Sequence, residues 1–504
     1  MLREMRRTVL ALVSAALLAL CFASGGLWGL AWVALIPLLI AVDQDTLGFA
    51  FLRGYASGFL FFISTLFWIH HVTSLGLILL SAYLALYWAI FSVGVARSSS
   101  WHLARRVIFL ASLWAGLEYV RAEVLSGFGW SALAHTQSVN ILFIQMADIT
   151  GTYGLSCLMV AVGVVIAVYL RVLLGREKMP AGFRSTAWGV VLVLCVVLVY
   201  GAGRLNVPAP LAKTRVALIQ ANVSLADYWD PLLKPYVVEK HLSLSHEAMK
   251  RAPQLIVWPE TSFPQFIWDY PGLFEKVRSF AREYKVKILL GAVTKTGEAY
   301  FNSAILIDAD GQMSQIYNKQ HLVLFGEYIP FRKEFPFLAK LVPIDDFTPG
   351  DRPVIFRLPK GVTFSSLICF EDTIPFLSRQ AAQNGAGFLV NITNDAWFGP
   401  SRQSRMHLDN AIFRAVENRM ALVRATNTGM SCGVLSTGEV VACVTAADGR
   451  QVMVDGFLIM DVPVKGDAGA GTLTFYTKYG DVFAMLCFIG ILAMSLPIKR
   501  NGEA

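Results

Sequence analysis

The sequence predicts a multi-pass α-helical membrane domain of eight helices joined to an α/β sandwich domain. Of its 504 residues, 55% are hydrophobic and only 15% are charged, a balance too apolar for a water-soluble protein of this size. Apolar runs of roughly membrane-spanning length recur through residues 8–203 and once more at 481–498. In 212–475, between them, charged residues return and the apolar runs shorten to the length of strands.

The eight apolar runs define the membrane part of the chain. A helix needs about 20 apolar residues to cross the hydrocarbon core of a bilayer, and these runs approach that length. They fall at 8–24, 26–42, 54–74, 76–97, 107–121, 153–171, 187–203 and 481–498. We therefore predict a transmembrane domain of seven helices in 1–211, and an eighth helix with a cytoplasmic tail in 476–504.

Basic residues between the helices predict the orientation. They form four clusters: Arg3, Arg6 and Arg7; Arg97, Arg105 and Arg106; Arg171, Arg176, Lys178 and Arg184; Lys499 and Arg500. With eight helices, all four clusters fall on one side of the membrane. Because basic loops stay in the cytoplasm, the domain at 212–475 is predicted to be extracytoplasmic.

The segment 123–152 is long for a loop and contains few charges. Its aromatic residues, such as Phe128, Trp130 and Phe143, favour a segment that lies at the membrane interface or re-enters the membrane. A plain amphipathic connector explains the same composition equally well.

The domain at 212–475 alternates short β-branched runs with helix-like stretches. Strands are predicted at 215–220, 254–258, 286–293, 302–307, 363–369, 388–392, 421–425 and 456–462. Helices are predicted at 235–251 and 271–284. This alternation is typical of an α/β sandwich whose sheets are covered.

Charge and cysteine content argue against two other functional classes. The formal net charge is +8, but the basic residues lie in short loops rather than in one patch, so we expect no nucleic-acid partner. The seven cysteines include no CxxC pair, and no zinc site is indicated. Cys432 and Cys443 would either bridge a hairpin in an extracytoplasmic domain or stay ordinary buried thiols.

Three predicted strand ends carry reactive side chains: Glu260 in WPET, Lys319 in YNK and Cys369 in ICFED. Each residue alone has an ordinary explanation, namely a helix cap, a solvated turn residue and a packed thiol. Their occurrence together, each after an apolar strand, favours a catalytic set.

These motifs resemble those of the nitrilase superfamily, whose members carry Glu, Lys and Cys in this chain order at strand ends. The sequence RAVEN at 414–418 is also similar to that superfamily. Within it, the chain resembles the apolipoprotein N-acyltransferase family through LFGEYIP at 324–330, TNDAWFG at 393–399 and LVRATNTG at 422–429. The resemblance covers essentially the whole chain, including seven predicted helices before the domain and one after it.

The resemblance implies a nitrilase-like αββα sandwich and acyl transfer through a thioester, without metal or cofactor. It makes Cys369 the nucleophile and Glu260 the general base. It places the ammonium group of Lys319 beside the oxyanion of the tetrahedral intermediate. A helix predicted to begin near Asp372 would add its dipole to the same task.

Further matches implied by the resemblance are Glu327, Glu371 and Trp229. Glu327 is expected to orient Lys319 and keep it protonated, with an ordinary surface ion pair as the alternative. Where family members often carry tyrosine after the nucleophile, this chain has Phe370, so no role of that hydroxyl carries over.

The resemblance also implies two lipid substrates. One is a glycerophospholipid that donates an acyl chain, and the other is an apolipoprotein whose N-terminal S-diacylglyceryl-cysteine accepts it on the amine. Because an acyl chain exposed to water costs about 0.8 kcal/mol per CH₂, the site is expected to open toward membrane lipid. An apolar loop suits that opening, or else the core; it contains Phe331, Phe335, Phe337 and Leu338. We expect a monomer in the cell inner membrane with a periplasmic catalytic domain.

Two other functions fit part of the sequence. The runner-up is a membrane-tethered carbon–nitrogen hydrolase that uses water as acceptor, for which eight helices would be an excessive anchor. The other is a transporter or receptor whose outer domain only binds, although transporters usually show charged or broken helices at mid-membrane. Glu118 and Arg121, spaced i to i+3 near a helix end, fit a structural pair better.

Overall fold

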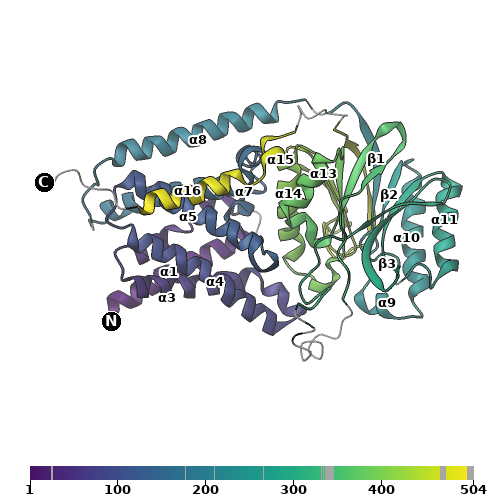
Figure 1. The fold of residues 1–504 in the computed structure, drawn as a ribbon, viewed down its shortest axis with the longest axis horizontal. Coiled ribbons are helices and arrows are strands. Elements are labelled where there is room, and N and C mark those ends of the chain that lie inside the picture. The colour runs from purple at the N-terminus through teal and green to yellow at the C-terminus, as the bar shows by residue number, and fades with distance from the viewer. Residues whose placement is uncertain are drawn as a thin grey trace. The chain divides into compact units, whose positions relative to one another are not determined.

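The computed structural model describes residues 1–504 except 24–25, 176, 209, 265, 331, 333, 335–345, 466–472 and 497–504. The chain forms two compact units, Met1–Asn206 with Tyr479–Ala504, and Val207–Lys478 (Figure 1). Several residues used in the sequence predictions lie outside the described residues: Arg176, Phe331, Phe335, Phe337, Leu338, Lys499 and Arg500.

The first unit is helical. Its α-helices are α1 (Leu2–Ala23), α2 (Ile36–Val42), α3 (Leu47–Thr65), α4 (Ser74–Arg97), α5 (Leu103–Glu123), α6 (Ile141–Ile144), α7 (Ala147–Leu173), α8 (Phe183–Leu205) and α16 (Val482–Ser495). In the described part of the chain, five are long and apolar enough to cross a membrane: α1, α3, α4, α7 and α8. The chain is therefore a membrane protein, while the number of eight spanning helices stays a prediction.

One predicted helix is wrong as a continuous element. The run 26–42 forms a 3-10 helix at Trp28–Trp32 and then the short helix α2. Pro37 lies in the first turn of α2, where its missing N–H costs nothing, but its ring would clash with the carbonyl of residue 33 in a continuous helix. The helix is therefore interrupted between these two pieces, while the polypeptide continues.

Two of the arginines counted for the orientation are buried and paired. Arg106 on α5 places Nη2 2.6 Å from Oδ1 of Asp43, just after α2, and Arg171 on α7 also pairs with Asp43. A buried charge is tolerated only when it is paired. Asp43 is the partner of both arginines, and it thereby connects the end of α2 to α5 and α7.

Glu118 and Arg121 both hold the segment that follows α5. Oε1 of Glu118 accepts hydrogen bonds from Leu133 N at 2.7 Å and from Trp114 Nε1 at 2.9 Å, and Nη1 of Arg121 donates to Trp130 O at 2.6 Å. Residues 130–138 are buried. The two charged residues are thus structural, and the placement of 123–152 relative to a membrane stays a prediction.

The second unit contains two six-stranded sheets. One has the order β12-β1-β2-β3-β4-β5 and the other β11-β10-β9-β8-β7-β6. The first comprises β1 (Lys213–Gln220), β2 (Leu255–Val257), β3 (Lys287–Thr296), β4 (Ala299–Ile307), β5 (Met313–Asn318) and β12 (Gly456–Pro463). The second comprises β6 (Ile355–Arg357), β7 (Thr363–Ile368), β8 (Phe388–Thr393), β9 (Leu422–Thr426), β10 (Cys432–Val434) and β11 (Val440–Cys443).

Alternating side chains of these strands build two apolar layers. Val216 and Leu218 of β1 pack with residues of the other sheet, such as Phe364 and Val390, between the two sheets. Ala217 and Ile219 of β1 point the other way, toward the helices α10 (Lys234–Met249) and α11 (Pro271–Tyr284). This period-2 alternation is what a strand buried on both faces requires.

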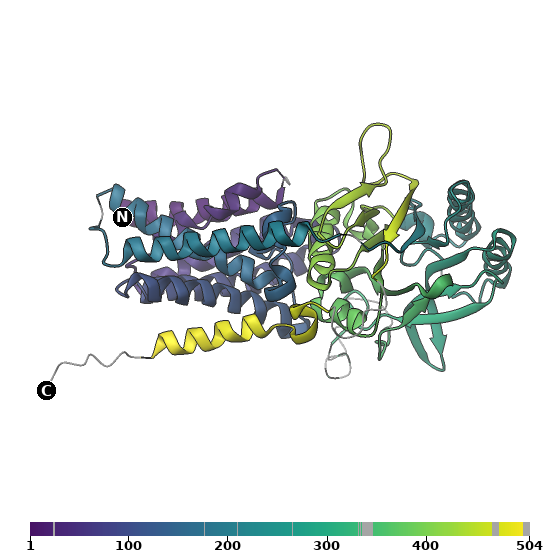
Figure 2. The ribbon, with the colours of Figure 1, turned by 90° about the horizontal axis from the view of Figure 1, so that it is seen from above.

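Helices cover the outer face of each sheet. Figure 2 shows the teal helices α10 and α11 on one side of the strands and the green helices α13 (Pro375–Gln383) and α14 (Gln403–Asn418) on the other. α13 packs against β7, and α14 packs against β9. The predicted αββα sandwich is confirmed.

Cys432 and Cys443 lie directly opposite each other in the antiparallel pair of β10 and β11. Both are free thiols in the structure. The two residues therefore have the register that the hairpin considered from the sequence requires.

Candidate active site

Glu260 follows β2, after the rigid Pro259, and its side chain is buried. Its Oε1 accepts a hydrogen bond from Asn302 Nδ2 at 2.8 Å, and its Oε2 accepts one from the backbone N–H of Asn394 at 3.0 Å. The carboxylate is therefore held from both sheets, by β4 on one side and by the end of β8 on the other.

Gly291 of β3 lets the backbone of Glu260 approach closely. A Cβ at this position would lie 2.6 Å from Glu260 Cα and 2.6 Å from Thr261 N, closer than real Cβ atoms come. Both clashing groups are backbone and cannot rotate away, so only glycine fits here.

We expect Gly291→Ala to displace Glu260. The overpacking should cost roughly 1–3 kcal/mol of stability, and the shifted base should slow alkylation of the Cys369 thiol by a haloacetamide. Thermal unfolding and peptide mapping of the alkylated protein measure the two effects. Gly272→Ala in α11 is the control, because a Cβ there meets nothing within 4 Å. Equal behaviour of the two variants would contradict the prediction.

Lys319 follows β5 and is almost completely buried, with 1% of its surface exposed. Its Nζ donates to Oε1 of Glu327 at 2.9 Å and lies 3.5 Å from Oε1 of Glu260. Burial alone would lower the pKa of Lys319, but the two carboxylates outweigh it and raise the pKa above the ordinary lysine value. The residue is therefore a fixed positive charge.

Glu327 is buried, so the alternative of a surface ion pair does not describe it. Besides Lys319, its carboxylate accepts hydrogen bonds from Asn302 Nδ2 at 2.8 Å and from Val323 N at 2.8 Å. Asn302 thus bridges Glu260 and Glu327, and the two carboxylates enclose one ammonium group between them.

Cys369 comes directly after β7, at a backbone φ of 53°. This left-handed conformation is strained for a residue with a side chain, and such strain is a known feature of catalytic positions. The helix predicted to begin near Asp372 is α13, which begins at Pro375 after a 3-10 helix at Cys369–Thr373. Pro375 fixes that start, since proline suits the first position of a helix.

The Cys369 thiol is protonated at rest. It keeps some solvent exposure, yet the surrounding protein desolvates its thiolate and, together with the charge of Glu260, raises its pKa well above the ordinary value. Lys319 opposes this rise. A base must therefore take the thiol proton when the sulfur attacks.

Glu371 connects the strand ends that carry Lys319 and Cys369. Its carboxylate accepts hydrogen bonds from Ile368 N at 2.7 Å, from Tyr317 Oη at 2.8 Å and from Gln320 N at 2.7 Å. Burial raises the pKa of Glu371 to about 7, against these donors and the charge of Lys319. The Glu371 side chain therefore holds the end of β5 against the end of β7.

Trp229 ends α9 (Leu225–Trp229) and has 55% of its surface exposed. Its ring forms an edge contact with Trp397, at 6.5 Å between centroids. The structure therefore does not join Trp229 to the buried set of Glu260, Lys319 and Glu327.

Phe370, the residue after Cys369, stacks its ring on that of His321, with 6.0 Å between the ring centroids.

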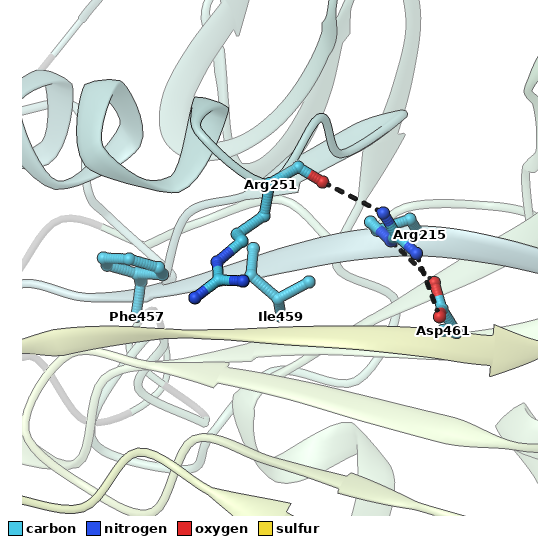
Figure 3. Close-up of a pocket in the computed structure, with 5 residues that line it drawn as sticks. All are labelled: Arg215, Arg251, Phe457, Ile459 and Asp461. Atoms are coloured by element: carbon cyan, nitrogen blue, oxygen red, sulfur yellow. Dashed lines mark hydrogen bonds and ion pairs between the residues drawn. The ribbon is translucent and has the colours of Figure 1, made fainter.

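A hollow of about 460 Å³ lies elsewhere in the second unit (Figure 3). It is lined by Arg215, Arg251, Phe457, Ile459 and Asp461. Arg215 is near the beginning of β1, whereas Glu260 and Cys369 follow the ends of parallel strands, so this hollow is not the candidate site.

Sequence reasoning missed two residues of the site. Asn302 was assigned only to a strand, and Asn394 only to a motif, yet both hold the carboxylate of Glu260. A polar residue within an apolar strand run was the available signal for Asn302, and the position after β8 was the signal for Asn394.

The site combines a protonated thiol, a buried carboxylate and a buried ammonium group. The carboxylate can accept the thiol proton, and the ammonium group can stabilise an oxyanion in a place shielded from water. This set suits nucleophilic acyl transfer through a thioester.

Several known proteins are similar to this chain. Residues 14–165 match the apolipoprotein N-acyltransferase N-terminal domain, and residues 215–454 match carbon-nitrogen hydrolase. An apolipoprotein N-acyltransferase from Caulobacter vibrioides is 30% identical over 84% of this chain and 79% of that protein. An amidase from Nesterenkonia of the nitrilase superfamily aligns with 51% of this chain and 93% of its own, at 20% identity and a TM-score of 0.38.

The most extensive of these likenesses is to the apolipoprotein N-acyltransferase from Geobacter metallireducens. The two sequences are 38% identical over 98% of this chain and 96% of that protein. The match spans the helical unit as well as the sandwich. The chain belongs to the apolipoprotein N-acyltransferase family.

Proposed function

We propose that the protein transfers a fatty acyl chain from a membrane glycerophospholipid to the N-terminal amine of S-diacylglyceryl-cysteine in apolipoproteins. The observation that carries the catalytic assignment is the ammonium group of Lys319, buried between the carboxylates of Glu260 and Glu327. Cys369, Glu260 and Lys319 are the proposed catalytic residues, supported by Glu327 and Glu371. Trp229 is proposed as a further supporting residue on the family resemblance alone.

The first half-reaction acylates the enzyme. Glu260 takes the thiol proton while the sulfur of Cys369 attacks the ester carbonyl of the phospholipid. Lys319 stabilises the oxyanion that forms. The ester C–O bond then breaks, and the released lysophospholipid alcohol takes the proton from Glu260.

The second half-reaction transfers the acyl chain. The amine of the diacylglyceryl-cysteine attacks the thioester carbonyl, and Glu260 takes a proton from that amine. The C–S bond breaks as the amide forms, and the proton on Glu260 returns to the sulfur. These steps use side chains alone, without metal or cofactor.

Intact-mass spectrometry of the purified protein tests this path. With phospholipid alone, the protein should gain one fatty-acyl mass on Cys369 and lose it only after a peptide bearing diacylglyceryl-cysteine is added. Release of free fatty acid at a similar rate without the peptide would replace the transferase with a hydrolase.

We further propose that the protein lies in the inner membrane as a monomer, with the sandwich in the periplasm. In a background without other accessible cysteines, an impermeant thiol reagent added from outside should label Lys240→Cys on α10. It should leave Lys178→Cys, between α7 and α8, unlabelled until the cells are opened. Labelling of position 178 in intact cells would reverse the orientation.

A further inference from the structure

A buried cluster of four charged side chains lies behind Cys369. It comprises Asp372 after the nucleophile, Asp395 after β8, His407 on α14 and Arg424 on β9, none more than 1% exposed. Arg424 pairs with Asp372, and Nε2 of His407 lies 2.8 Å from Oδ1 of Asp372. None of these residues has a part in the proton transfers described above.

His407 contacts acceptors with both ring nitrogens. Nε2 is 3.2 Å from the carbonyl oxygen of Cys369, and Nδ1 is 3.2 Å from Oδ1 of Asp395. Gln403 Nε2 lies 3.3 Å from the same Nδ1, but it has its own acceptor, because it donates to Oδ1 of Asp395 at 3.1 Å. A neutral ring can donate from only one nitrogen, so this arrangement favours the imidazolium form. That form also balances the cluster, because two cations then face two carboxylates.

The charged neighbours of His407 favour the same protonated form. Burial alone would lower the pKa of His407, but Asp372 and Asp395 outweigh both burial and Arg424 and raise it to about 9. The imidazolium therefore persists through neutral pH.

The carbonyl of Cys369 has a second donor in Asn391 of β8, whose Nδ2 is 3.1 Å away. Two side chains thus fix the peptide that follows the strained φ of Cys369. Such strain persists only where the surrounding structure holds it in place.

The imidazolium of His407 is also connected to Glu260, through Asp395 and Asn394. Asp395, its second partner, directly follows Asn394, whose N–H donates to Glu260 at 3.0 Å. Gly429 closes the other side of Asp395, since a Cβ there would lie 2.0 Å from Oδ2 of Asp395. The Asp395 carboxylate therefore has little freedom to shift.

We propose that His407 is a positioning residue that, held as an imidazolium between Asp372 and Asp395, fixes both the strained backbone of Cys369 and the peptide that binds Glu260. The inference rests on the proposed function, because it takes Cys369 as the nucleophile and Glu260 as its base.

The test uses the full-length protein in detergent and His407→Gln, which keeps an N–H donor but removes the charge. Acylation by phospholipid, followed by intact mass, should slow by at least about tenfold, as expected for a misplaced reacting group. The KM for phospholipid should change by less than about twofold, since no substrate contact is lost. Alkylation of Cys369 by iodoacetamide, followed by peptide mapping, should slow in parallel.

Two further variants separate positioning from folding. Asn391→Leu removes the second donor without touching a charge and should slow both reactions, by less than His407→Gln. His241→Gln removes another buried imidazole, on α10, and serves as the matched control for lost stability. It should keep the parent rates per folded molecule.

Parent rates within about twofold in folded His407→Gln would overturn the proposal. So would losses that only follow the unfolded fraction, as measured with His241→Gln. Failure of the proposed function is distinguishable, because the parent would then form no acyl adduct while iodoacetamide still reported the reactivity of Cys369.

Discussion

We expect Cys369→Ala to form no fatty-acyl adduct with phospholipid, because the thioester requires its sulfur. Alanine tolerates the φ of 53° about as well as cysteine, so the variant should fold. Cys369→Ser should be nearly as inactive, since a hydroxyl has a much higher pKa and a carboxylate deprotonates it poorly. Intact mass after incubation with phospholipid measures both variants.

Cys443→Ala is the matched control, because it removes another thiol of the same unit on β11. It should retain the adduct. An adduct that persists in Cys369→Ala would show that another group is acylated, and the mechanism would have to be rebuilt.

We expect Lys319→Arg to lower turnover by roughly two orders of magnitude or more, the loss typical of a missing oxyanion contact. The ammonium group lies 2.9 Å from Glu327 and 3.5 Å from Glu260 at 1% exposure, so the larger planar guanidinium cannot take the same place. The rate of acyl transfer to a diacylglyceryl-cysteine peptide measures the change.

Lys276→Arg on α11 provides the control, because this lysine forms only an exposed ion pair with Glu239. It should retain normal turnover. Normal turnover in Lys319→Arg as well would reduce Lys319 to a structural charge.

The strands of the sandwich were predictable where they contain a run of apolar residues. Each of the eight predicted strands is present, because buried β-branched runs such as that of β8 have few other structures open to them. Lys319 was placed at a strand end, but the range of β5 was not predicted, because Ser314 and Gln315 interrupt its apolar pattern at the sheet edge. β6, β10 and β11, of three or four residues each, were also not predicted.

The candidate site was predictable only in part. Glu260, Lys319 and Cys369 each belong to a local motif, so the sequence alone is enough to propose them. The side chains that hold them come from elsewhere: Asn302 lies 42 residues from Glu260, and His407 lies 38 residues from Cys369. Contacts over such separations depend on how the sheets pack, which no local pattern encodes.

The pairing of β1 with β12 brings the two ends of the sandwich side by side. These first and last strands of the sandwich are antiparallel along their whole length, from Lys213 opposite Pro463 to Gln220 opposite Gly456. The chain therefore enters and leaves the sandwich at neighbouring points. A module with adjacent ends can be inserted into one loop of a host protein without forcing the host's flanking segments apart. A soluble ancestor of the sandwich could thus have entered an existing helical protein through a single gene insertion, with both folds kept intact.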